Sequence, residues 1–222
     1  MWVRRMMGGR GALGRIAFVL VLFLLTGYEI ALPVYDAPAR VLVHSVSDGD
    51  TVVLEGGKRV RYLGIDAPEV AHEGRPGDPL GDGAARYNRN LVSGRWVTLE
   101  FERERQDDYG RLLAYVFLED GTLVNRELVR QGLAYLCSKQ RPLRYWDRLL
   151  DAQRRAIEER RGLWSLPPPR PEAVYMANRR SGVFHRPSCP LGRSAKPSNR
   201  VQFKERSQAF SEGFCPCRQC RP

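Results

Sequence analysis

Short β-forming runs separated by glycine-containing turns constrain the fold of this chain more than any other feature. Residues 40–54 hold two such runs around an Asp-Gly-Asp turn, and Gly56-Gly57 joins the second run to a third over residues 58–65. Residues 95–104 alternate apolar and polar side chains, and residues 112–118 form a further strand-like run closed by Glu119-Asp120-Gly121. Alternation with a period of two, bounded by turn residues, is typical of half-buried strands. We therefore expect five strands between residues 40 and 118.

Three helices are expected to accompany these strands. A loop rich in Gly and Pro spans residues 70–82, and Asp82 is the expected N-cap of a helix over residues 83–91. Further helical patterns cover residues 123–131, ending at Gly132, and residues 143–161, ending at Gly162. Five strands and three helices in this order predict an OB-fold, a small closed five-stranded barrel with helices packed on it.

Proline marks a domain boundary. Four of the five residues from 167 to 171 are proline, a composition typical of a stiff linker. We predict an OB-fold domain at residues 40–166, a Pro-rich linker at 167–178 and a small C-terminal module at 179–222.

The first 39 residues resemble a targeting segment. Arg4, Arg5, Arg10 and Arg15 precede or border an apolar run over residues 16–25. Positive charge followed by an apolar run is the pattern of a secretory signal peptide or an N-terminal membrane anchor. The strongly apolar part is shorter than the roughly 20 residues that cross a bilayer, so cleavage and retention both stay open. In either case we expect the folded part to work outside the cytoplasm, secreted or anchored to the membrane.

The charge is basic and unevenly distributed. The net charge is +11 and residues 170–222 contribute 11 basic and 3 acidic side chains, whereas residues 40–169 hold 21 and 20. Such a balance favours a polyanionic partner, either nucleic acid or an anionic membrane. Most of the excess lies in the C-terminal module.

Charged residues within the predicted barrel form a set suited to phosphodiester hydrolysis. Asp50 and Asp66 offer hard oxygen ligands for Ca²⁺ or Mg²⁺. Arg61 and Arg111 have the planar fork that grips phosphate oxygens. Glu69 is placed to orient or deprotonate a water. A metal, two arginines and a carboxylate together stabilise the charge that develops on phosphorus and activate the nucleophile.

The segments that carry these residues resemble the staphylococcal nuclease (thermonuclease) family. They read SDGDTVVL, VRYLGIDAPE, DDYGRLLAYVFLEDGTLVNRELVRQGLA and RRGLW, and span residues 40–166. The resemblance implies an OB-fold and a Ca²⁺-dependent phosphodiesterase that acts on DNA, RNA or both and leaves 3′-phosphate ends. No organic cofactor is expected.

The resemblance also implies roles for single residues. Asp50 and Asp66 would be side-chain Ca²⁺ ligands, Ala67 would offer its backbone carbonyl, and Asp48 would support the metal through water. Arg61, Glu69 and Arg111 would be the catalytic residues, and Tyr109 would contact a substrate phosphate. Asp108 departs from the family pattern, since the best-known relative has a basic residue there, and this leaves substrate preference open. Tyr135 and Tyr145 are expected in the core rather than at the substrate.

The C-terminal module carries a metal-binding pattern. His185 and Cys189 are followed after 27 residues by Cys217 and Cys220, giving His-x₃-Cys and Cys-x₂-Cys. One nitrogen and three sulfurs suit tetrahedral Zn²⁺, and a segment this short needs such a staple. Cys215 is an alternative to Cys217, and disulfide bonding is the competing interpretation.

This module resembles the zinc-binding domain of the Ada DNA-repair protein. GVFHRPSCP, RVQFKERSQAFSEGF and PCRQCRP carry the resemblance. His185 occupies the position of the cysteine that accepts a methyl group there, and imidazole cannot perform that transfer. The resemblance therefore implies a structural Zn²⁺ module without repair activity. Its basic side chains are candidates for phosphate contacts: Arg179, Arg180, Arg186, Arg193, Lys196, Arg200 and Lys204.

Cys137 is expected to be a small buried side chain of the barrel. Two other functions stay open beside the nuclease. One is a non-catalytic nucleic-acid-binding protein that uses the same barrel. The other is a membrane-anchored adaptor that binds a partner through the zinc tail.

Overall fold

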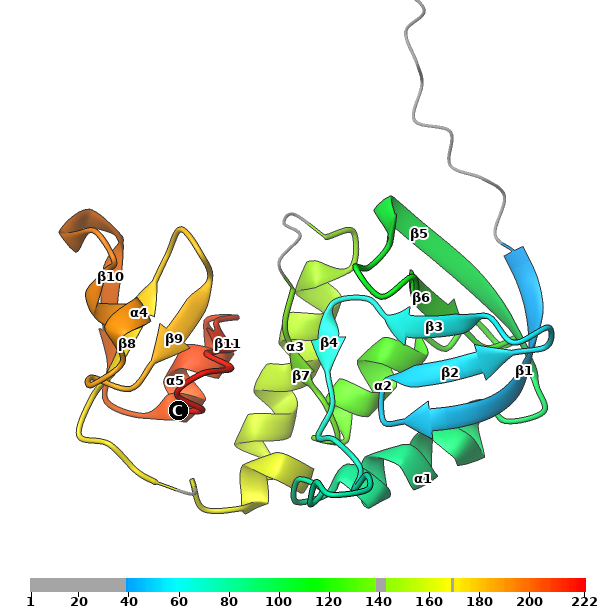
Figure 1. The fold of residues 1–222 in the computed structure, drawn as a ribbon, viewed down its shortest axis with the longest axis horizontal. Helices are drawn as coiled ribbons and strands as arrows, with labels where there is room; N and C mark the ends of the chain where they lie inside the picture. Colours follow the sequence, from blue (N-terminus) through cyan, green and yellow to red (C-terminus); the bar gives the residue numbers. More distant parts are fainter. Residues whose placement is uncertain (1–38, 139–142, 169) are drawn as a thin grey trace, which may run out of the picture. The chain divides into compact units, whose positions relative to one another are not determined.

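A closed barrel of five strands forms the larger part of the fold (Figure 1). The computed structural model describes residues 39–138, 143–168 and 170–222. The barrel strands are β1 (Ala39–Asp48), β2 (Thr51–Leu54), β3 (Arg59–Tyr62), β5 (Trp96–Gln106) and β6 (Leu112–Phe117). Their order around the barrel is β1-β2-β3-β6-β5, with β5 pairing back to β1. All pairs are antiparallel except β3 and β6. The predicted five-stranded OB-fold is confirmed.

Three helices cover the barrel, as predicted. They are α1 (Gly81–Val92), α2 (Val124–Arg130) and α3 (Trp146–Glu158). Helix α1 buries Ala84, Asn88 and Val92. Their four-residue spacing places them on the helix face that packs against β1 (Figure 1). Helix α2 packs against β6 and α3 against α2. Apolar side chains from the strands fill the barrel, among them Val43, Val52, Val60, Val97, Leu99 and Val116.

The predicted N-cap of α1 was wrong. Leu80 precedes the helix with a left-handed φ of 69°, and Asp82 lies in the first turn. An acid in the first turn still favours the helix, because the N-terminal end of the helix dipole is positive. The chain bends at Leu80 because Gly81 packs against the loop before it. A Cβ at Gly81 would lie 2.1 Å from the carbonyl oxygen of Glu69, so only glycine fits there.

Gly49 makes a second close approach, in the turn between β1 and β2. A Cβ at this position would lie 2.6 Å from the Cβ of Ala67 and 2.7 Å from the Cβ of Ala84. The absent side chain lets the turn pack against both the loop after Asp66 and helix α1. The turn that carries Asp48 and Asp50 is thereby fixed against the segment that carries Asp66.

Two short strands form a separate two-stranded sheet beside the barrel. β4 (Ile65–Asp66) pairs antiparallel with β7 (Tyr135–Leu136). The run predicted over residues 58–65 is divided between β3 and β4. Gly64 separates β3 from β4 with a φ of 85°, a left-handed conformation that favours glycine. The bend at Gly64 turns the chain away from the barrel before it reaches Asp66.

The C-terminal module contains a four-stranded sheet in the order β10-β8-β9-β11. The strands are β8 (Tyr175–Asn178), β9 (Val183–His185), β10 (Arg200–Phe203) and β11 (Cys215–Pro216). Two short helices, α4 (Pro190–Arg193) and α5 (Arg206–Ser211), connect them. A reciprocal capping box between Glu205 and Gln208 begins α5. β8 lies within the predicted linker at residues 167–178, so the sheet includes residues before 179.

Contacts between α3 and α5 join the module to the barrel domain. The Gln153 side chain accepts a hydrogen bond from the backbone N–H of Leu136 at 2.7 Å and donates one to the carbonyl of Phe210 at 2.6 Å. The rings of Tyr135 and Trp164 pack edge-on against Phe210, with centroids at 5.3 and 4.9 Å. One small hydrophobic core therefore holds side chains from both parts.

The predicted targeting segment, residues 1–39, lies outside the described residues apart from Ala39. Within the described part of the chain, no helix is long and apolar enough to cross a membrane.

Asn125 should contribute strongly to stability. Its buried amide accepts from the N–H of Val116 and donates to the carbonyl of Leu63, both at 2.9 Å. Asn125→Ala leaves these two backbone groups without their partner, which should lower the free energy of unfolding by about 2–4 kcal/mol. Urea unfolding of Asn125→Ala and of the exposed control Asn90→Ala checks this. Equal stability of the two variants would contradict it.

Candidate active site and metal-binding cluster

Arg61 brings together the two carboxylates predicted to bind metal. Asp50 lies in the β1–β2 turn directly before β2, Arg61 lies on β3, and Asp66 ends β4. The guanidinium of Arg61 forms ion pairs with both Asp50 and Asp66. It also lies 3.4 Å from the carbonyl oxygen of Ile65. Three residues predicted as site residues therefore meet at one point.

Asp50 is held in a defined orientation. It is only 1% exposed, and its Oδ2 accepts a hydrogen bond from the N–H of Ala67 at 2.7 Å. Its Oδ1 accepts one from the hydroxyl of Thr51 at 3.2 Å. A buried carboxylate is costly unless it is paired and hydrogen-bonded, and Asp50 satisfies both conditions. The contact of Ala67 here is through its N–H, and the role of its carbonyl stays a prediction.

Asp48 supports the same turn. Its Oδ1 accepts a hydrogen bond from the N–H of Asp50 at 3.0 Å, while its carbonyl accepts one from the Asn88 side chain at 3.2 Å. Burial raises the pKa of Asp48, and the positive charges of Arg61 and Arg111 oppose that shift. Both arginines therefore act on the electrostatics of this turn.

Tyr135 holds Asp66 from the other side. Its hydroxyl donates to Oδ2 of Asp66 at 2.9 Å. Burial, together with the negative charge of Asp66, raises the pKa of Tyr135 well above its ordinary value, so the hydroxyl keeps its proton and stays a donor. Tyr135 packs in the core, as expected, and so does Tyr145, whose ring packs edge-on against Tyr115 at 4.7 Å. The hydrogen bond to Asp66 was not foreseen.

Glu69 lies on the loop after β4 with an exposed side chain. Its backbone is fixed through Asp78: the N–H of Glu69 donates to Asp78 Oδ2 at 3.3 Å, and its carbonyl accepts from the N–H of Asp78 at 2.9 Å. The carboxylate is thus free to meet solvent and substrate while its backbone stays in place.

Arg111 is positioned by Asp107, a residue that the sequence analysis missed. Nε of Arg111 donates to Oδ2 of Asp107 at 2.7 Å, and the N–H groups of Tyr109 and Arg111 donate to Oδ1 at 3.0 Å each. Burial raises the pKa of Asp107, but these hydrogen bonds outweigh it and hold the pKa below its ordinary value. The sequence feature that could have identified this contact is an acidic residue four positions before Arg111.

Tyr109 is 85% exposed, and the Arg111 guanidinium lies 5.6 Å from the centre of its ring. The pair lies on the β5–β6 connection, and the charge of Arg111 acts on Asp48 in the β1–β2 turn. An exposed aromatic ring beside an arginine suits contact with a nucleic-acid strand.

The carboxylate cluster fits a divalent cation. Asp50 and Asp66 both direct an oxygen to the same positive group, the Arg61 guanidinium, so their charges converge. Hard carboxylate oxygens at one point are the donors that Ca²⁺ and Mg²⁺ prefer. The two carboxylates suit Ca²⁺ or Mg²⁺, and the predicted Ca²⁺ stays a prediction.

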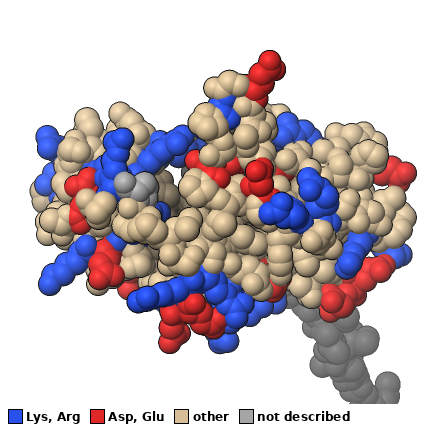
Figure 2. All heavy atoms as spheres, turned by 90° about the horizontal axis from the view of Figure 1, so that it is seen from below, with Lys and Arg blue, Asp and Glu red and all other residues tan. Residues whose placement is uncertain are grey.

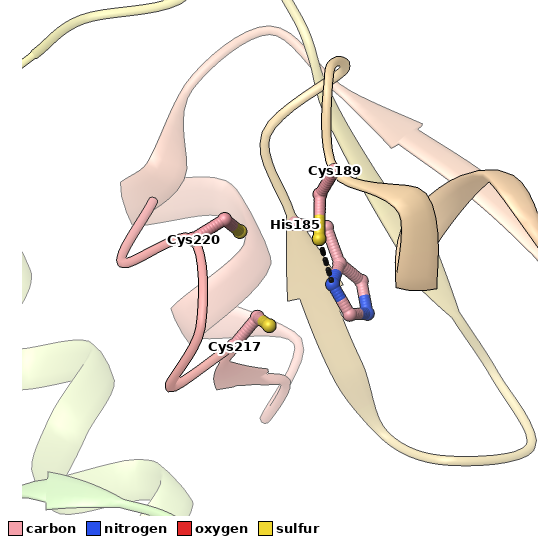
Figure 3. A group of neighbouring side chains, drawn as sticks. All are labelled: His185, Cys189, Cys217 and Cys220. Carbon is pink, nitrogen blue, oxygen red and sulfur yellow. Dashed lines mark hydrogen bonds between the residues drawn. The ribbon is translucent and has the colours of Figure 1, made fainter.

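The predicted zinc ligands also converge (Figure 3). His185 and Cys189 come from β9 and the loop after it, whereas Cys217 and Cys220 come from the C-terminal loop. Their ligand atoms all lie within 4.8 Å of one another. Nδ1 of His185 lies 3.4 Å from Sγ of Cys189. The set matches the Cys₃His composition of a structural zinc site.

Burial affects the nitrogen and sulfur ligands differently. It lowers the pKa of His185, which keeps the imidazole neutral and able to ligate. Burial, with smaller contributions from Cys189 and Cys217, raises the pKa of Cys220 to about 12, which disfavours its thiolate. A bound cation would remove that penalty, since a coordinating thiol loses its proton.

Cys215 is a disulfide partner rather than a zinc ligand. It is bonded to Cys137, which lies just after β7 in the barrel domain, and their Cα atoms are 5.0 Å apart. The disulfide joins the two parts of the fold covalently. Simple counting could have found it, because a Cys₃His site leaves two of the five cysteines.

Basic and acidic side chains are interspersed on the face drawn in Figure 2. Three of the arginines proposed for phosphate contacts have partners within the module, and one of them, Arg193, donates to the carbonyl of Pro187 at 3.1 Å. Arg186 pairs with Glu172 at 2.7 Å and donates to the carbonyl of Cys220 at 2.9 Å. Arg200 donates to the carbonyls of Ala195 and Arg193 at 2.7 Å each.

Comparison with known proteins agrees with this geometry. The family model described as "Staphylococcal nuclease homologue" matches residues 59–166, and that described as "Metal binding domain of Ada" matches residues 170–222. The chain is 34% identical to a thermonuclease of Staphylococcus intermedius over 126 residues, which are 55% of this chain and 74% of the relative.

Two further relatives are bacterial endonucleases. The endonuclease YncB of Bacillus subtilis is 36% identical over 63% of this chain and 65% of its own length. An uncharacterized endonuclease of Escherichia coli is 33% identical over 70% of this chain and 94% of its own length. With this coverage and the barrel site described above, the chain belongs to the family of staphylococcal nuclease homologues.

Proposed function

We propose that this protein is a Ca²⁺-dependent phosphodiesterase that hydrolyses DNA and RNA and leaves 3′-phosphate ends. The observation that carries the proposal is the convergence of Asp50 and Asp66 on the guanidinium of Arg61. Acidic ligands for a cation and a phosphate-binding arginine then share one point. The resemblance to the thermonuclease family supports Ca²⁺ as the metal and 3′-phosphates as the product ends.

The chemistry divides among the residues of the site. Bound to Asp50 and Asp66, Ca²⁺ would supply positive charge to a phosphate oxygen. Arg61, released from its pairs with the carboxylates, would bind the scissile phosphate with its two-pronged fork. Glu69, exposed on its loop, would accept a proton from the attacking water.

Arg111 and Tyr109 would act on the same phosphate group and its neighbour. Asp107 fixes the guanidinium of Arg111, so little conformational freedom is lost when it meets the charge of the transition state. The exposed hydroxyphenyl group of Tyr109 would contact a substrate phosphate. Asp48 would keep the turn and the metal ligand Asp50 in place.

A digestion assay tests the proposed function. The purified protein should cleave plasmid DNA and RNA with Ca²⁺ and lose activity in excess EGTA. The products should carry 3′-phosphates, which block extension by a polymerase until a phosphatase removes them. Arg61→Ala and Glu69→Ala should each reduce kcat by a factor of at least about 100, because each removes a group that acts in the transition state.

Two exposed residues outside the site provide matched controls. Arg89→Ala on α1 and Glu73→Ala on the loop should keep wild-type turnover. Near-normal activity of Arg61→Ala or Glu69→Ala would remove these residues from the mechanism. Nucleic-acid binding without any cleavage would instead support the non-catalytic alternative.

For the C-terminal module we propose one structural Zn²⁺ bound by His185, Cys189, Cys217 and Cys220. The buried, convergent ligand atoms support it, as does the match to the metal binding domain of Ada. Without a metal, this small sheet would depend on a hydrophobic core of few side chains.

Metal analysis can separate the zinc ligands from the disulfide. The wild-type protein should contain about one zinc per chain by plasma emission spectrometry. Cys217→Ser should lose it, whereas Cys215→Ser should retain it, since Cys215 is bonded to Cys137. The reverse result would make Cys215 the ligand.

We also propose that the protein works outside the cytoplasm, secreted or held by its N-terminal segment. The Arg-rich start followed by an apolar run supports this, and so does the disulfide between Cys137 and Cys215, because disulfides persist in oxidising compartments. Cell fractionation with thiol alkylation should find the protein outside the cytoplasm, with both cysteines protected. Cytoplasmic protein with both thiols free would contradict the proposal.

A further inference from the structure

The zinc loop reaches the nuclease site. Arg218 lies between the zinc-binding residues Cys217 and Cys220, and its guanidinium is 3.9 Å from Oδ1 of Asp66. Arg221 comes directly after Cys220, and its guanidinium is 4.0 Å from Oδ1 of Asp78. Asp78 is the residue that holds the backbone of Glu69. The module thus places positive charge beside two segments of the site.

The position of this loop is determined by several contacts. Gln153 and Arg154 on α3 donate to the carbonyls of Phe210 and Ser211 at 2.6 and 2.8 Å. The disulfide of Cys215 ties the chain two residues before Cys217 to the barrel domain. The backbone between two ligands of one metal has little freedom to move. Arg218 is therefore presented to Asp66 on a fixed support.

The weak contact with Asp66 leaves the Arg218 guanidinium available to bind a phosphate. The side chain is 81% exposed, and at 3.9 Å the pair is at the limit of an ion pair. Exposed pairs of this kind contribute little to stability. Asp66 already has Arg61 and Tyr135 as partners at shorter range. The guanidinium of Arg218 can thus exchange this weak contact for a phosphate at low cost, and its planar fork suits phosphate oxygens.

We propose that Arg218 is a substrate-binding residue of the nuclease, which contacts a backbone phosphate of the nucleic acid next to the scissile one. This rests on the proposed hydrolysis at Asp50, Asp66 and Arg61. The zinc module would then extend the binding site of the barrel by one arginine. Phosphate binding by Arg218 does not require the net positive charge of the rest of the zinc module.

Kinetics with single-stranded DNA test the proposal. Arg218→Ala should raise KM about tenfold and leave kcat within about twofold, because a contact with a flanking phosphate is the same in ground and transition states. Arg170→Ala removes an equal charge from an exposed position just before β8 and should leave KM unchanged. Arg218→Lys, which keeps the charge but not the fork, should raise KM less than Arg218→Ala.

Direct binding provides a readout independent of turnover. In a Glu69→Ala background, fluorescence anisotropy with a labelled DNA 12-mer should show weaker binding for Arg218→Ala, with a salt dependence reduced by the loss of about one phosphate contact. Zinc content should stay at one per chain in each variant, which shows that the loop is intact.

Three results distinguish the possible failures. If the wild-type protein cleaves DNA but Arg218→Ala behaves like Arg170→Ala, the role of Arg218 is wrong and the nuclease function stands. If Arg218→Ala changes only the Ca²⁺ concentration for half-maximal activity, Arg218 acts on the metal site and the proposal is overturned. If the wild-type protein does not cleave any nucleic acid, the proposed function itself fails.

Discussion

The pairing of Arg61 with Asp50 and Asp66 is the interaction on which the functional structure depends. For this pairing, the β1–β2 turn and the end of strand β4 must both lie beside the Arg61 side chain of strand β3. Gly49 lets the turn approach Ala67, the bend at Gly64 separates β4 from β3, and the Arg61 side chain on β3 pairs with both carboxylates. In the absence of a bound cation, two neighbouring carboxylates would repel each other, and the arginine between them offsets that repulsion. The arginine proposed to bind the scissile phosphate thereby also stabilises the pair of carboxylates.

Local patterns in the sequence were enough to predict the barrel, whereas the roles proposed for its site residues came from the family resemblance and stay predictions. Short β-forming runs separated by glycine turns mark β1, β2, β3, β5 and β6. The metal and phosphate ligands could be proposed because they fall at the ends of those strands. The zinc ligands could be proposed because their spacing is short within each pair.

Features that depend on contacts between distant residues were missed. The disulfide of Cys137 joins residues 78 positions apart, and no local pattern signals their approach. Strands β4 and β7 are two residues long, too short for any periodicity. The start of α1 at Gly81 follows from a close approach to the Glu69 carbonyl, which is a tertiary contact. Asp82 was a reasonable cap by residue type, but packing at the preceding loop determined where the helix begins.

The barrel domain and the C-terminal module of this nuclease share a hydrophobic core around Phe210. Tyr135 and Trp164, which precede the Pro-rich linker, pack on a side chain that follows it, and Gln153 hydrogen-bonds to both sides. A boundary drawn from sequence at residue 166 therefore cuts through a single packed interior. The zinc module and the barrel domain therefore share one hydrophobic core and do not pack as independent units. If the module were exchanged between homologues, the aromatic side chains of the barrel domain that pack against it would have to be exchanged as well.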